Sequence, residues 1–240
     1  VTTAVEHHAV LNCCQQLEQE GWEVTTILPD QNGNISAESV LAAVRPDTAL
    51  VSVMMVNNEL GSIYPIADIA KGLKAVNEKT LLHTDAVQGF LKVPFSAKAL
   101  GADFIAISGH KVGAPKGIGA LYIGPRVRNP RPLLPGGGQE MGLRSGTEAT
   151  AQIAGFAKAV ELRWDHLEDK LHHMAEVKAY AVEKLTAIPD LQIIGSGKAP
   201  HVLSVSMAGW PSQNVVNDLG SQGICVSAGS ACHHGKSSQV

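Results

Sequence analysis

The chain alternates between short apolar runs and longer segments in which apolar residues recur at helical spacing. Continuous apolar runs are typical of strands that a sheet buries on both faces. The runs of strand length are 24–28, 49–56, 80–84, 104–107, 120–123, 191–194, 202–205 and 224–226. The helical patterns cover 6–20, 36–44, 66–77, 97–100 and 215–219. This alternation predicts an α/β fold with a mostly parallel central sheet flanked by helices, with 120–123 returning antiparallel.

Two later segments predict how the chain divides into domains. Residues 124–147 are rich in proline and glycine, which predicts a loop. Residues 148–185 are charged and helical, long enough for two helices or one bent helix. We expect residues 1–166 to form a large domain. Residues 167–240 then form part of a smaller α+β domain.

Composition and charge narrow the possible classes of protein. The 240 residues are 45% hydrophobic and 17% charged, which suffices for one large α/β core or two smaller units. The net charge of −3 argues against a nucleic-acid partner, and no apolar run approaches the length of a membrane span. Cys13 and Cys14 are adjacent on a predicted helix, where they are poor disulfide partners. We therefore expect a reducing compartment, the cytoplasm, with these two thiols and Cys225 packed in the interior.

A hydroxyl, an imidazole and an amine lie together where a predicted core strand ends. Ser108, His110 and Lys111 directly follow the run 104–107 and precede a turn-rich segment that cannot be helical. A poorly solvated lysine can lose its proton and form a Schiff base, while Ser108 and His110 can donate hydrogen bonds to a phosphate. The alternative is an ordinary solvated lysine at a strand end.

Two more predicted strands end in polar residues. Asn58 follows the run 49–56, while Asp85 and Gln88 follow 80–84. Because ligands of parallel sheets bind at the carboxyl ends of the strands, these residues are candidates for one site. An aspartate that keeps a pyridine nitrogen protonated and a lysine that holds an aldehyde are what pyridoxal phosphate requires. Taken singly, Asp85 could cap a helix or form a salt bridge, Asn58 could shape a turn, and Gln88 could occupy a first helical turn.

Six segments together resemble cysteine desulfurases of the iron–sulfur assembly type. These are fold-type I pyridoxal-phosphate enzymes of the class V aminotransferase family. The matching segments are 6–7, 56–61, 83–88, 108–111, 136–147 and 227–232. Their order and spacing match over nearly the whole chain, so the resemblance implies the fold-type I large domain with part of the small domain.

The resemblance implies a role for each matched position on the cofactor ring. Lys111 would bind the aldehyde of pyridoxal 5′-phosphate and later move a proton. His7 would stack on the pyridine ring and take part in acid–base steps. Asp85 would pair with the ring nitrogen, and Gln88 would hydrogen-bond the ring oxygen.

Other matched positions would hold the phosphate and the substrate. Ser108 and His110 would bind the cofactor phosphate, and Asn58 would orient the cofactor or the substrate carboxylate. Thr147 would reach the phosphate of a neighbouring subunit, which implies a homodimer.

Cys232 is the implied nucleophile. It follows a run of small residues, which predicts a mobile loop, and His233 and His234 could lower the pKa of its thiol. Its thiolate would attack the sulfur of the bound substrate and become a persulfide. The alternatives are a loop cysteine without a role, or a metal ligand. The histidines lack the spacing of a zinc motif, so we predict no metal site.

The resemblance thus implies an enzyme that converts L-cysteine to L-alanine and passes the sulfur to an acceptor or scaffold protein. A selenocysteine lyase, another fold-type I enzyme, or an inactive truncated relative acting as a binding module are the alternatives. We also expect two family elements to lie outside the chain. These are a Gly/Thr-rich phosphate loop before Val1 and a carboxylate-binding arginine after Val240.

Overall fold

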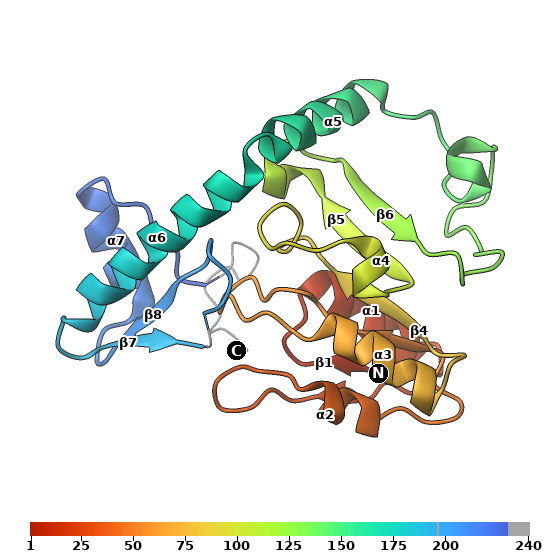
Figure 1. The fold of residues 1–240 in the computed structure, drawn as a ribbon, viewed down its shortest axis with the longest axis horizontal. Helices are drawn as coiled ribbons and strands as arrows, with labels where there is room; N and C mark the ends of the chain where they lie inside the picture. The colour runs from red at the N-terminus through yellow and green to blue at the C-terminus, as the bar shows by residue number, and fades with distance from the viewer. Residues whose placement is uncertain (196, 230–240) are drawn as a thin grey trace.

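The computed structural model describes residues 1–195 and 197–229, and its centre is a mixed sheet (Figure 1). Its strand order is β3 (Leu50–Ser52), β4 (Leu81–Asp85), β5 (Phe104–Ser108) and β6 (Gly119–Ile123). The first three strands are parallel and β6 is antiparallel to β5. The predicted α/β class and the antiparallel return are both confirmed.

A short parallel pair extends this sheet on the side of β3. It consists of β1 (Thr2–Thr3) and β2 (Thr26–Ile27). The Ser52 amide donates to the carbonyl of Val1 at 2.9 Å, so the N-terminal segment lies beside β3. The residues after β1 are thereby held near the end of β3.

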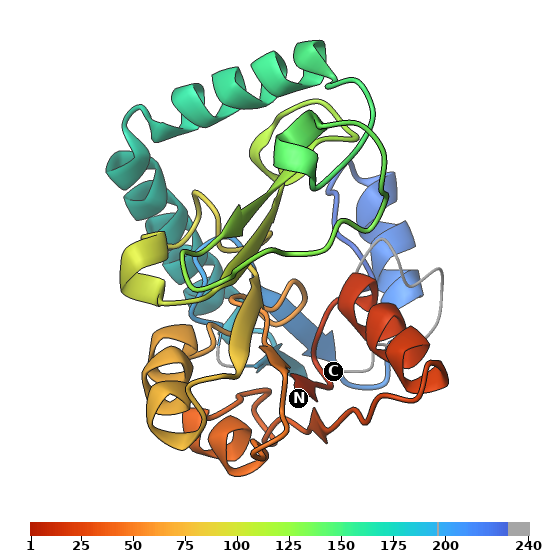
Figure 2. The ribbon, with the colours of Figure 1, turned by 90° about the vertical axis from the view of Figure 1, so that its right-hand side faces the viewer.

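Helices cover both faces of the sheet. Figure 2 shows α1 (His8–Gln19) on one side, with α2 (Ala37–Ala42) and α3 (Ile66–Val76) on the other. As predicted, the Ser36 side chain caps α2, because its Oγ accepts the amide of Ser39 at 3.0 Å. The short α4 (Ala97–Leu100) ends at Gly101, whose φ of 72° favours glycine.

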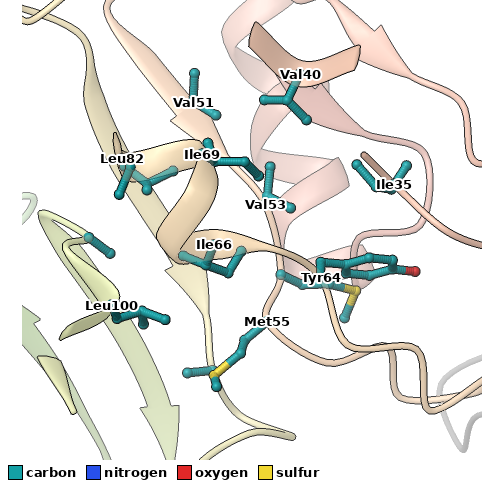
Figure 3. Close-up of a cluster of buried hydrophobic side chains, with 14 of the residues drawn as sticks. Ile35, Val40, Val51, Val53, Met55, Tyr64, Ile66, Ile69, Leu82 and Leu100 are labelled. Atoms are coloured by element: carbon teal, nitrogen blue, oxygen red, sulfur yellow. The ribbon is translucent and has the colours of Figure 1, made fainter. Parts of the chain in front are cut away.

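The main hydrophobic core lies between α2, α3 and the sheet (Figure 3). Val40 of α2 and Ile69 of α3 are fully buried, as are Val51 and Val53 on the sheet side. The apolar residues of α3 repeat at the spacing of one helical face: Ile66, Ile69, Ala70 and Leu73. Each such aliphatic side chain contributes about 1.5–3 kcal/mol by its burial.

The predicted helical segment 148–185 contains two helices. They are α5 (Thr150–Trp164) and α6 (Leu167–Thr186), and the chain bends between them at His166, whose φ is 53°. Figure 2 shows the bend. Beyond α6, the antiparallel strands β7 (Leu191–Ile194) and β8 (Ser204–Met207) are followed by α7 (Ser212–Ser221).

Several sequence predictions need correction. Residues 224–226 form no strand, and Cys225 is exposed rather than buried in a core. Cys13 is likewise exposed, because it lies on the solvent side of α1. β3 ends at Ser52, although the apolar run continues to Val56, which forms an isolated bridge with Ile63. An apolar run indicates which residues are buried, and here the buried residues extend beyond the last residue of the strand.

Candidate active site

The ends of β3, β4 and β5 meet at one edge of the sheet. Asp85, the last residue of β4, pairs in register with Ala106, two residues before the end of β5. The Met55 amide donates to the carbonyl of Asp85 at 2.8 Å, which places the segment after β3 alongside. The polar residues that follow these strands therefore share one edge.

The carboxylate of Asp85 is almost completely buried, with the residue 9% exposed. Its Oδ1 accepts a hydrogen bond from the Val87 amide at 2.9 Å, within the turn that follows β4. Such a bond orients a side chain against its own backbone. A buried, oriented carboxylate at a strand end can pair with a protonated ring nitrogen.

The chain tightens into a short 3₁₀ helix directly after β5. This helix, η1 (Gly109–Val112), contains His110 and Lys111. Ser108 Oγ lies 2.8 Å from Nδ1 of His110, so a hydrogen bond joins the two side chains. Partial burial and the positive charge of Lys111 lower the pKa of His110. A hydroxyl and an imidazole held together beside an amine can donate several hydrogen bonds to one anion.

The residue between Ser108 and His110 must be glycine because a side chain there would clash with its neighbours. A Cβ at Gly109 would lie 2.8 Å from Cγ2 of Ile118 and 3.1 Å from its carbonyl oxygen. Glycine therefore allows the turn that brings Ser108 and His110 together.

Gln88 joins the cluster through a second lysine that the sequence analysis did not single out. Lys92 is 6% exposed, and its Nζ donates to Oε1 of Gln88 at 3.0 Å. Burial, followed by the charges of Arg163 and Lys111, lowers the pKa of Lys92 to about 8. Lys111 itself is exposed, in the last turn of η1. Two lysines thus lie near enough for their charges to interact.

His7 begins α1. Its Nδ1 accepts a hydrogen bond from the Ala9 amide at 3.1 Å, so the neutral ring carries its proton on Nε2. The neighbouring Glu6 is 5% exposed, and its Oε1 accepts from the Met54 amide at 2.8 Å and from Oγ1 of Thr3 at 2.7 Å. Glu6 therefore ties the segment that carries His7 to the chain after β3.

Asn57 holds the loop in which Asn58 lies. Asn57 is 1% exposed, and its Nδ2 donates to the carbonyl of Val5 at 3.1 Å. Its Oδ1 accepts the amides of Glu59 at 2.9 Å and Leu60 at 2.8 Å. Asn58 is half-buried in the same loop. The sequence pattern showed a polar strand end, whereas the structure shows that the first of the two asparagines holds this loop by its hydrogen bonds.

One predicted site residue is described away from this cluster, and another lies among residues that the structure does not describe. Thr147 lies exposed before α5, and within 1–195 and 197–229 no hydrogen bond or ion pair joins it to the other candidates. Cys232 lies outside the described residues, as do His233 and His234.

The residues at the sheet edge have the chemistry to hold pyridoxal phosphate. Asp85 suits a ring nitrogen, Lys111 an aldehyde, and the bonded pair of Ser108 and His110 a phosphate. Of the residues that the structure describes, no group of three or more His, Cys, Asp or Glu is arranged to hold a metal ion. In the same part of the chain, no helix is long and apolar enough to cross a membrane.

Comparison with known proteins reveals close relatives. A cysteine desulfurase of Nostoc sp. is 40% identical over 238 residues, which cover 98% of this chain and 59% of that protein. Cysteine desulfurase IscS of Clostridium botulinum is 38% identical over 239 residues, with 97% and 59% covered. The chain thus spans less than two thirds of the length of these curated relatives.

Solved structures show the same relationship. A NifS-like protein superposes with a TM-score of 0.90 at 39% identity, over 95% of this chain and 62% of that protein. A structure of SspA in complex with cysteine superposes with a TM-score of 0.79 at 35% identity, over 97% and 64%. The sequence profile described as aminotransferase class-V matches residues 1–239. The strand-end site and these matches agree, and the chain belongs to the class-V aminotransferase family.

Proposed function

We propose that the protein is a pyridoxal-phosphate-dependent cysteine desulfurase. It converts L-cysteine to L-alanine and transfers the sulfur to its own cysteine and then to an acceptor protein of iron–sulfur cluster or thio-cofactor synthesis. The observation that carries the proposal is the shared edge of β4 and β5. There the buried Asp85 lies alongside the segment that contains Ser108, His110 and Lys111. The relatives named cysteine desulfurase and the cysteine-bound SspA structure support this choice of substrate.

The chain's own residues would divide the binding of the cofactor among them. When bound, pyridoxal 5′-phosphate supplies an aldehyde that links to amines and a ring that accepts electrons. Lys111 would hold the aldehyde and Asp85 the ring nitrogen, while Gln88 would donate to the ring oxygen. Ser108 and His110 would hold the phosphate, and His7 would lie against the ring.

Different side chains would carry out proton transfer and sulfur transfer. The ionised carboxylate of Asp85 would keep a proton on the ring nitrogen, which stabilises negative charge that develops on the substrate. The Lys111 amine would carry protons to and from the substrate carbons, and Asn58 would orient the substrate carboxylate. The thiolate Sγ of Cys232 would attack the substrate sulfur. An S–S bond then forms, the C–S bond breaks, and the carbon gains a proton, which yields alanine and a persulfide.

The oligomeric state of the enzyme, its division into domains and its cellular compartment are part of the same proposal. A homodimer in which Thr147 reaches the neighbouring subunit is supported by the exposure of Thr147 and of apolar residues in the loop before it. Leu133 of that loop is 92% exposed and Met141 is 91% exposed. The bend at His166 supports a large domain of residues 1–166 and a smaller one from 167 onward. The exposed free thiols of Cys13 and Cys225 support the cytoplasm as the compartment.

The proposal is tested with the purified full chain and added pyridoxal 5′-phosphate. The wild type should turn yellow and release sulfide from cysteine in the presence of a thiol. Lys111→Ala should lose the absorbance of the lysine-linked cofactor, whereas Cys232→Ser should keep the colour and lose sulfide release. Cys225→Ser is the matched control because it removes another thiol, an exposed one, by the same substitution, and it should retain both properties.

Three outcomes would contradict the proposal. Unchanged sulfide production by Cys232→Ser would remove Cys232 as nucleophile. Turnover of selenocysteine but not of cysteine would indicate a lyase instead. A wild-type protein that acquires no colour would indicate a binding module without this chemistry.

A further inference from the structure

A buried lysine requires a structural explanation, because lysines are almost never fully buried without a partner. Lys92 is 6% exposed and lies in the turns that follow β4. Its Nζ lies 3.0 Å from Oε1 of Gln88 and 3.5 Å from the carbonyl oxygen of Val87. The first contact is the shorter, so Gln88 is the main partner.

The contact determines which way the Gln88 amide faces. A lysine ammonium has three donors and no acceptor, so it can bond only to the oxygen of an amide. With Oε1 bound to Lys92, Gln88 keeps its Nε2 as the group for a ligand. A hydrogen bond from a charged donor is stronger than one between neutral groups, which favours this orientation over the flipped one.

The same turn carries Asp85. The Val87 amide donates to Oδ1 of Asp85, and the Lys92 amine bonds to the next residue along, Gln88. Backbone bonds from Phe90 to Ala86 and from Lys92 to Gly89 close the turn. One compact segment therefore sets both the carboxylate and the amide at the sheet edge. A half-buried amide that presents N–H groups suits an electron-rich oxygen on the ligand.

We propose that Lys92 is a positioning residue that holds the Gln88 amide with its N–H groups toward the ring oxygen of the bound cofactor. This inference rests on the proposed function. Lys92 acts through its hydrogen bond to Gln88 and need not contact the cofactor or the substrate.

The test compares Lys92→Met, Gln88→Ala and the double variant in the full chain loaded with pyridoxal 5′-phosphate. Methionine keeps the aliphatic volume of lysine but removes the donor. Lys92→Met should weaken cofactor binding about fivefold, the size of one net hydrogen bond. It should also shift the absorbance maximum in the same direction as Gln88→Ala. The double variant should show no more than the shift of Gln88→Ala alone.

Two further variants separate positioning from stability. Lys98→Met is the matched control, since Lys98 is an exposed lysine in α4, and it should match the wild type. Gln88→Glu keeps a partner for Lys92, and therefore the fold, but replaces the donating amide by an acceptor. It should reproduce the spectral shift of Gln88→Ala even if Lys92→Met folds poorly.

The failure of this inference differs from the failure of the proposed function. A yellow wild type together with an unshifted Lys92→Met would overturn the role of Lys92 alone. An unshifted Gln88→Glu would overturn it together with the donation from Gln88 to the ring oxygen. A full additional shift from Lys92→Met in the Gln88→Ala background would overturn it as well. A wild type that takes up no cofactor would refute the proposed function and, with it, this inference.

Discussion

Oε1 of Glu6 accepts a hydrogen bond from the amide of Met54 at 2.8 Å, and this bond joins the N-terminal segment to the chain after β3. The other oxygen, Oε2, is buried and has no hydrogen-bond partner within the described part of the chain. A buried carboxyl in this state favours its neutral form, because an unpaired charge is costly to bury. Burial is accordingly the main cause that raises the pKa of Glu6 from 4.5 to about 8, with a smaller contribution from the charge of Asp85.

Glu6→Gln should flatten the pH dependence of stability. Between pH 4.5 and about 8 the unfolded chain has lost the Glu6 proton while the folded chain keeps it. The folded state thus binds more protons, and stability falls as pH rises through this window, by on the order of 1 kcal/mol per pH unit. Glutamine has no such proton to lose. Urea unfolding across this pH range measures how the free energy of unfolding changes with pH in the wild type and in Glu6→Gln.

Glu148→Gln is the control for that measurement, because Glu148 is exposed before α5. The free energy of unfolding of this variant should change with pH as it does in the wild type. Identical slopes for Glu6→Gln and the wild type would show that Glu6 is ionised in the folded state.

Asn57→Ala should destabilise the protein by about 2–4 kcal/mol. The substitution removes the bonds to Val5, Glu59 and Leu60 and leaves buried backbone groups without partners. Chemical unfolding measures the loss. Asn12→Ala, at an exposed position of α1, should change the free energy of unfolding by less than about 0.5 kcal/mol. Equal effects of the two substitutions would contradict the role given to Asn57.

Gly119→Ala should disturb the pairing of β5 with β6. A Cβ at Gly119 would lie 2.6 Å from the carbonyl oxygen of Ile107, and backbone cannot give way as a flexible side chain can. The register pair of Gly119 is Ser108, so the shift should also reach Ser108 and His110, the pair proposed to bind the phosphate. We expect a loss of about 1–3 kcal/mol, seen as a lower melting temperature, together with weaker cofactor binding.

Gly220→Ala provides the contrast. Nothing lies within 4 Å of a Cβ at Gly220, which is in α7, so alanine should be neutral or stabilise by up to about 1 kcal/mol. A melting temperature that falls equally in both variants would argue against the close approach at Gly119.

Ser108→Ala should weaken cofactor binding about fivefold with little change in stability. The hydroxyl orients His110 across 2.8 Å, and its loss removes one hydrogen bond and one restraint. Titration of the chain with pyridoxal 5′-phosphate measures the affinity. Ser212→Ala in the exposed first turn of α7 is the control. Unaltered affinity in Ser108→Ala would remove Ser108 from the phosphate site.

The sequence by itself determined the class of fold and the position of most elements. Apolar runs at 80–84 and 104–107 predicted β4 and β5 closely, and the helical spacing from Ile66 predicted α3. These predictions succeeded because local periodicity records which face of an element is buried. The polar residues that end the strands could also be read from the sequence, and their order resembled one family.

Only the tertiary structure decided which polar groups touch. Glu6 meets Met54 across 48 positions of sequence, and Asn57 meets Val5 across 52. No sequence pattern singled out Lys92, which is buried, and Cys225, which is exposed, was predicted to be a core residue. Burial and hydrogen bonding of single polar groups depend on how distant segments pack, and one-dimensional spacing contains no record of that packing.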